Sequence, residues 1–222
     1  MTKIRIKEII RTRRKTLTLS VNPDATLIIK APLFTPMPFI NHFIERNYKW
    51  IAKQVALIRS VPKVKKHKFI EGEEFLFLGK FYKLNIGHFI SITIDGNYLR
   101  FPKSKSEKIK VKLLEWYKKQ ALEFITSRVE FYAKKMKVKY GKIKVTSAKN
   151  RWGSCSHSNN LRFRWTLIMT PVEIIDYVVV HELAHITHKN HSQIFWAYVR
   201  NYIPDIKRRI KWLKTNHGLL SI

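Results

Sequence analysis

The sequence predicts an α+β fold in which a β-rich first part precedes a mainly helical second part. Apolar and polar residues alternate through residues 1–34 and 69–101, which is typical of strands. From about Glu107 to Lys137, apolar residues recur every three or four positions and predict a long amphipathic helix. A further helical pattern then carries the motif His181-Glu182-Leu183-Ala184-His185. These three observations place the candidate chemistry in the second part.

The first part is predicted to contain strands and one helix. Strands at Leu17–Val21 and Leu27–Ile29 flank a turn and form a hairpin. Thr35-Pro36 opens a single helical pattern, whose apolar face extends to Ile58. The lysine-rich residues 60–68 predict a linker.

Two more hairpins are predicted before the break in pattern at residues 102–106. One turns at Gly79, and the other turns at Asp95-Gly96-Asn97. We therefore expect two domains, a β-rich domain over 1–102 and a catalytic domain over 103–222.

The second part is predicted to begin with the long helix as a backing element. A strand over Lys142–Ser147 and a hairpin over Ala148–Trp165 follow it. Thr170-Pro171-Val172-Glu173 has the pattern of a capping box for the motif helix. Ser192 and Asp205 are expected to cap two C-terminal helices, which Pro204 separates.

The motif residues have the spacing of a metal site. His181 and His185 stand one turn apart on one helical face, so both rings can reach a single zinc ion. Glu182 lies where it could take a proton from a metal-bound water. The competing interpretation is a core helix whose histidines are satisfied by hydrogen bonds.

A catalytic zinc needs a third protein ligand and an open fourth position. His191 is the preferred candidate, because a helix that ends near Lys189-Asn190 would let the chain turn back toward the metal. His188 shares the helical face of His181, but it would lie about 10 Å further along the axis. One ion could not easily meet both.

Composition restricts the environment and the partners. The chain has 222 residues, 45% of them hydrophobic, which is enough for a core. Cys155 is the single cysteine, and the N-terminal residues lack the apolar stretch of a signal peptide. No apolar run reaches the roughly 20 residues of a membrane helix. We expect a cytoplasmic protein with no membrane partner, and these features leave the oligomeric state unassigned.

The charge is strongly positive. Lys and Arg number 44 against 15 Asp and Glu, a formal net charge of +29. Such an excess favours polyanions, so non-specific nucleic-acid or nucleotide binding is one interpretation. A lysine-rich solvated surface is the other.

Several segments together resemble the YgjP-like (DUF45) metallopeptidase family, which is related to the SprT-like and WLM zinc metalloproteases. They are Arg151-Trp152-Gly153-Ser154-Cys155-Ser156, the Phe163-Arg164-Trp165 strand, the H-E-x-x-H helix, His188-Lys189-Asn190-His191-Ser192 and Phe195-Trp196. The resemblance implies a zincin-like catalytic part with zinc on His181, His185 and His191 and with Glu182 as catalytic base. Arg164 departs from it, because an asparagine is expected before the second tryptophan.

The predicted function is a zinc-dependent hydrolase, in the first place a metallopeptidase acting on a peptide or protein. Arg151 is the candidate for stabilising the oxyanion, and Trp152, Ser154 and Trp165 are candidate substrate contacts. One alternative is a metal-dependent nucleotide phosphohydrolase of the pyrophosphatase kind. Another is a nucleic-acid-associated protease with DNA-dependent activity.

Overall fold

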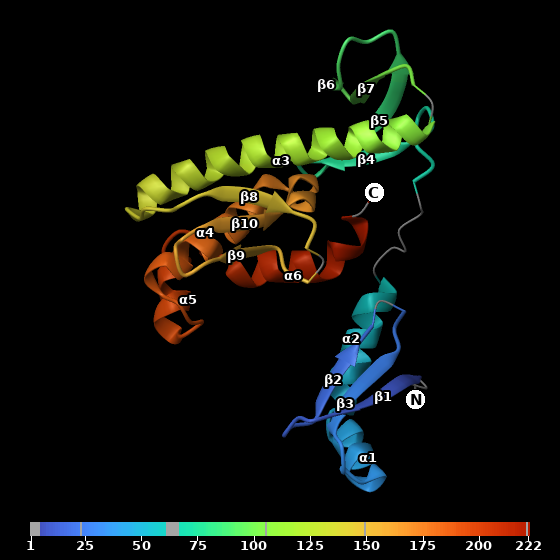
Figure 1. Ribbon diagram of the computed structural model, residues 1–222, viewed down its shortest axis with the longest axis vertical. Coiled ribbons are helices and arrows are strands. Elements are labelled where there is room, and N and C mark those ends of the chain that lie inside the picture. The colour runs from blue at the N-terminus through green and yellow to red at the C-terminus, as the bar shows by residue number, and fades with distance from the viewer. Residues whose placement is uncertain (1–4, 23, 61–66, 105, 149, 221) are drawn as a thin grey trace. The chain divides into compact units, whose positions relative to one another are not determined.

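The computed structural model divides the chain into two compact units, residues 1–63 and 64–222 (Figure 1). It describes residues 5–22, 24–60, 67–104, 106–148, 150–220 and 222. Both units mix helices with small sheets, which confirms the α+β prediction. Each unit is described below by itself.

The first unit is a three-stranded sheet with two helices. β3 (Leu27–Pro32) is central, pairing antiparallel with β2 (Thr18–Val21) and parallel with β1 (Ile6–Thr12). The predicted hairpin is therefore confirmed as β2–β3. Its core consists of Leu27, Ile29, Ala31, Ile40, Ile51 and Val55.

The helix predicted from Thr35 to Ile58 is interrupted. The structure has α1 (Met37–Arg46) and α2 (Tyr48–Ser60), with Asn47 between them. The Asn47 side-chain amide donates to the carbonyl of Phe43 over 2.7 Å. Asparagine side chains compete in this way with the helical backbone, which accounts for the break.

The second unit begins with a four-stranded sheet in the order β4-β5-β7-β6. Both hairpins predicted here are confirmed, since β4 pairs with β5 and β6 with β7 in antiparallel fashion. The strands are β4 (Glu74–Phe77), β5 (Lys80–Gly87), β6 (Thr93–Asp95) and β7 (Tyr98–Pro102).

This sheet belongs with the part that carries the H-E-x-x-H motif, which differs from the predicted boundary at 102. The backbone N–H of Leu78 donates to Ile168 over 2.7 Å, and that of Gly79 donates to Met169 over 3.1 Å. A Cβ atom on Gly79 would lie 2.9 Å from Pro171. The β4–β5 turn thus packs at the start of the motif helix, and the division falls between residues 63 and 64. Residues 61–66 of the predicted linker lie outside the described residues.

The predicted long helix is confirmed as α3 (Ser106–Met136). Figure 1 shows it running along the β4–β7 sheet and then along a second sheet of order β8-β10-β9. In that sheet β10 is central and β9 lies at an edge. The strands are β8 (Ile143–Thr146), β9 (Gly153–Cys155) and β10 (Leu161–Arg164).

Four helical elements complete this part of the described chain before the C-terminal turn. They are η1 (Trp165–Met169), α4 (Val172–Thr187), α5 (Gln193–Arg200) and α6 (Ile206–Asn216). A short 3-10 turn, η2 (His217–Leu219), follows. α4 carries the motif and is buried along most of its length, as its apolar pattern predicts.

The predicted caps were right in one case of three. Ser192 accepts a hydrogen bond from the Phe195 N–H over 3.3 Å and caps α5. Thr170 does not cap α4, because its hydroxyl donates to the carbonyl of Leu167 over 2.8 Å. Asp205 stands at the N-cap of α6, but its carboxylate pairs with arginines and caps no N–H group.

An ion pair ties α4 to α3. The Arg128 guanidinium donates to both carboxylate oxygens of Asp176, over 2.6 and 2.8 Å. The Tyr132 hydroxyl adds a third donor over 3.2 Å. Asp176 is buried, and bidentate pairing of this kind fixes orientation as well as distance. The motif helix is therefore anchored about one and a half turns before His181.

Candidate metal centre

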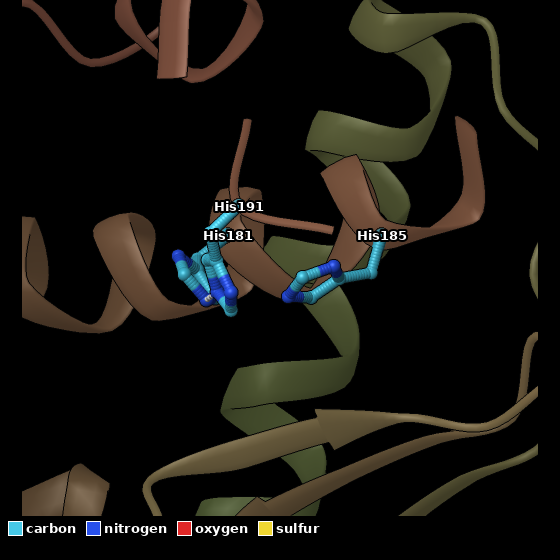
Figure 2. A group of neighbouring side chains, drawn as sticks. All are labelled: His181, His185 and His191. Atoms are coloured by element: carbon cyan, nitrogen blue, oxygen red, sulfur yellow. Dashed lines mark hydrogen bonds between the residues drawn. The ribbon is translucent and has the colours of Figure 1, made fainter. Parts of the chain in front are cut away.

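Three histidines converge where α4 ends. His181 and His185 project from the same face of the helix, which stops at Thr187. The chain then turns and returns His191, so that one ring nitrogen of each histidine lies within 4.8 Å of the others. Figure 2 shows the three imidazole rings facing a common point. The helix ends close to where the sequence predicted.

The ring nitrogens are arranged for coordination. Nε2 of His191 lies 3.0 Å from Nε2 of His181. Nδ1 of His185 lies 3.1 Å from the carbonyl oxygen of His188. Because a carbonyl only accepts, Nδ1 of His185 carries the proton and Nε2 keeps a free lone pair. Hydrogen bonding of the second nitrogen in this manner orients metal-binding histidines.

His188 itself lies outside this group. Its ring packs edge-on against Tyr198, with centroids 5.1 Å apart. Its backbone carbonyl orients His185 instead, a role that the sequence pattern does not reveal.

The environment keeps two of the rings neutral. Burial, reinforced by His185 and His191, lowers the pKa of His181 to about 3. Burial also lowers the pKa of His185. Metal binding requires an unprotonated imidazole nitrogen, so these rings are prepared to bind a cation and need lose no proton near neutral pH.

Aromatic rings form the wall behind the histidines. Phe195 is buried and lies 4.6 Å from the His185 ring and 4.8 Å from the His191 ring, centroid to centroid. The Trp196 ring lies 5.6 Å from those of both His181 and His191. Nδ1 of His181 is buried and has no hydrogen-bond partner in the described part of the chain. The His181 ring is therefore held in place by packing against Phe195 and Trp196 of α5.

Glu182 occupies a tight position beside the strand β9. It is 5% exposed, and burial raises the pKa of its carboxyl to about 8, against the opposing effect of Arg151. A Cβ atom on Gly153 would lie 2.7 Å from Oε1 of Glu182. Only glycine leaves room for the carboxylate here. The sequence singled out the Gly153 loop without revealing this contact.

Of the other predicted site residues, Arg151, Trp152 and Ser154 are at least partly exposed, whereas Trp165 is buried. Arg151 is exposed, and Ser154 lies opposite Arg162 in the β9–β10 ladder. The Arg164 guanidinium lies over the Trp152 ring, 4.9 Å from its centroid. Trp165 differs from expectation: it is 8% exposed and packs 6.0 Å from the Tyr117 ring in the core. Its burial leaves almost no surface for a substrate.

The donor set fits a catalytic metal ion. Three imidazole nitrogens suit zinc and neighbouring transition metals. A three-residue set also leaves a coordination position for water or substrate, and His191 is exposed to solvent.

In the described ranges, no helix is both long and apolar enough to cross a membrane.

Two solved structures are similar to part of this chain. None of the curated proteins matches the chain. Among solved structures, the jannalysin zymogen of Methanocaldococcus jannaschii is 24% identical, with a TM-score of 0.36, over 40% of this chain and 91% of its own. The abylysin zymogen of Pyrococcus abyssi is 22% identical, with a TM-score of 0.37, over 41% of this chain and 97% of its own. Both of these proteins are metallopeptidase zymogens.

The family comparison covers much more of the chain. The model of the YgjP-like metallopeptidase domain matches residues 15–216, which include both compact units in large part and the whole histidine cluster. This match, together with three histidines gathered around one point, implies a metal-dependent hydrolase. The chain belongs to the YgjP-like metallopeptidase family.

Proposed function

We propose that this protein is a zinc metallopeptidase in which His181, His185 and His191 hold the metal. The observation that carries the proposal is the convergence of one ring nitrogen from each histidine within 4.8 Å, at the end of a helix that also presents Glu182. Catalytic zinc sites use three protein ligands and one open position. Zinc is proposed as the metal because three imidazole donors suit it.

Glu182 is proposed as the general base. When bound, the metal supplies Lewis acidity and lowers the pKa of a coordinated water toward 7. The Glu182 carboxylate would accept a proton from the water that attacks the scissile carbonyl, and it could later return that proton to the leaving amine. Burial already shifts its pKa to about 8, and a pKa near the working pH suits a group that both takes and gives a proton.

The edge strand β9 is proposed to hold the substrate. Its partner β10 occupies one side only, so the other edge is available for an extended peptide to add by main-chain pairing. Trp152 and Ser154 are then near the bound peptide. Arg151 adjoins the same strand, and its charge influences Glu182, so it is proposed to stabilise the oxyanion.

One experiment separates this function from nucleotide hydrolysis, which the net charge of +29 favours as a second candidate. Zinc-loaded protein is incubated in parallel with casein and with the four nucleoside triphosphates. Peptide fragments without release of phosphate or pyrophosphate support the peptidase. Nucleotide turnover with intact casein would overturn it.

A further inference from the structure

A cavity of about 660 Å³ opens between the end of α5 and the start of α6. Its volume is typical of a ligand pocket. The apolar wall consists of Trp196, Ile206 and Ile210. Basic residues from both helices surround it. No step of the proposed mechanism uses this cavity.

Trp196 connects the cavity to the metal centre. Its indole lines the cavity and also stacks on His191, with ring centroids 5.6 Å apart and planes inclined by 29°. A group bound in the cavity therefore contacts the same ring that supports a proposed ligand. The cavity therefore borders the aromatic ring that packs on a proposed metal ligand.

The charge of the cavity is positive and not compensated internally. Its one acidic lining residue, Asp205, accepts hydrogen bonds from Arg208 over 2.7 Å and from Arg209 over 2.6 Å. Arg200 and Lys207 also line the cavity, and within the described ranges neither forms an ion pair. Two cationic side chains thus remain for an anion.

We propose that this cavity is a specificity pocket for an acidic side chain of the peptide substrate. The methylene groups of that side chain pack on Trp196 and Ile210, and its carboxylate meets Arg200 and Lys207. The inference rests on the proposed peptidase function and names the kind of peptide that it prefers. Apolar walls with a few polar groups that fix orientation are the usual construction of such pockets.

The test uses two pools of randomised, fluorescein-labelled decapeptides. They are identical except that every glutamate of one pool is glutamine in the other. Partly exposed charge pairs contribute roughly two- to fivefold each, so peptides with glutamate at the position that meets the pocket should be cleaved about tenfold faster than the same peptides with glutamine there. The double variant Arg200→Glu/Lys207→Glu should lose or invert this preference. Both positions are exposed, so the fold should tolerate the change.

The matched control is Lys112→Glu/Lys118→Glu on the exposed face of α3, which changes the net charge equally and should keep the preference. Equal cleavage of both pools by the wild type, or an unchanged preference in the pocket variant, would overturn the proposal.

Binding of the same pools to zinc-loaded Glu182→Gln, followed by fluorescence anisotropy, separates the pocket from the chemistry. Selective binding without wild-type cleavage leaves the pocket standing and refutes the peptidase. Cleavage by the wild type without selective binding supports the peptidase and refutes the pocket.

Discussion

Gly153 and Glu182 are in such close contact that a Cβ atom on the glycine would lie 2.6 Å from Cγ of the glutamate. Carbon atoms that are not bonded normally approach to about 3.5 Å. The absence of a side chain at Gly153 therefore leaves the space that the proposed base occupies. It also brings the edge strand proposed for the substrate directly against that base.

We expect Gly153→Ala to impair hydrolysis while leaving the metal bound. The added methyl group must displace the Glu182 carboxylate or the strand, and small displacements of catalytic groups cost on the order of 10²-fold in rate. Zinc content, measured by elemental analysis, should stay near that of the wild type, because the three histidines are untouched.

A double variant tests whether this effect passes through Glu182. In a Glu182→Gln background, Gly153→Ala should reduce the residual rate little further, since residues acting as one unit are not additive. Fully multiplicative losses would show that Gly153 acts by another route.

The ligand set gives the second prediction. Purified without chelator, the protein should carry about one zinc per chain. His191→Ala should lose most of it, because the third nitrogen of the cluster is removed. His188→Ala should retain most of it, because the His188 ring packs on Tyr198 and only its backbone carbonyl orients His185. The reverse pattern in elemental analysis would assign the third ligand to His188.

The Arg128–Asp176 pair gives a prediction about stability. Arg128→Ala leaves a largely buried carboxylate without its main partner, which should lower the free energy of unfolding by about 2–4 kcal/mol. The double variant Arg128→Met/Asp176→Leu should be less destabilised, because no charge remains buried. Urea denaturation followed by circular dichroism measures both. A double variant with a lower free energy of unfolding than Arg128→Ala would contradict this account.

The basic surface of α3 gives a prediction about partners. Lys118, Lys119, Lys134 and Lys135 are all exposed, although Lys119 approaches Glu123 to 4.0 Å. We propose that this surface binds DNA or RNA weakly and without sequence preference, with an affinity that falls steeply as salt rises. Changing the four lysines to glutamate should abolish retardation of a labelled duplex and leave the zinc content unchanged. If the wild type shows no retardation near ~50 mM salt, the charge serves solvation or substrate steering instead.

The sequence allowed the histidine cluster to be predicted because its signals are local. A helical pattern alone indicates that His181 and His185 lie one turn apart. The end of that pattern indicates where the chain can turn and bring His191 back. The long helix α3 and the hairpins were likewise predictable from periodicity and turn residues. The structure agrees with each of these elements.

Features that depend on distant contacts were not predictable. The strand pattern of the sequence does end near residue 102. Backbone hydrogen bonds from Leu78 and Gly79 to η1 nevertheless join the preceding sheet to the unit that contains the motif helix. Trp165 ends the hairpin that was predicted to precede the motif helix, but it packs against Tyr117 of α3. The Gly153–Glu182 contact joins a strand to a helix, and no spacing rule relates the two positions.

The most direct test of the account compares casein hydrolysis by the wild type and by Glu182→Gln, both loaded with zinc to the same measured occupancy. The substitution preserves the shape of the side chain and removes the proposed base. We predict that the variant binds zinc normally and loses roughly 10²–10⁴-fold in rate. Equal rates at equal zinc occupancy would contradict the assignment of Glu182 as the base of a zinc peptidase.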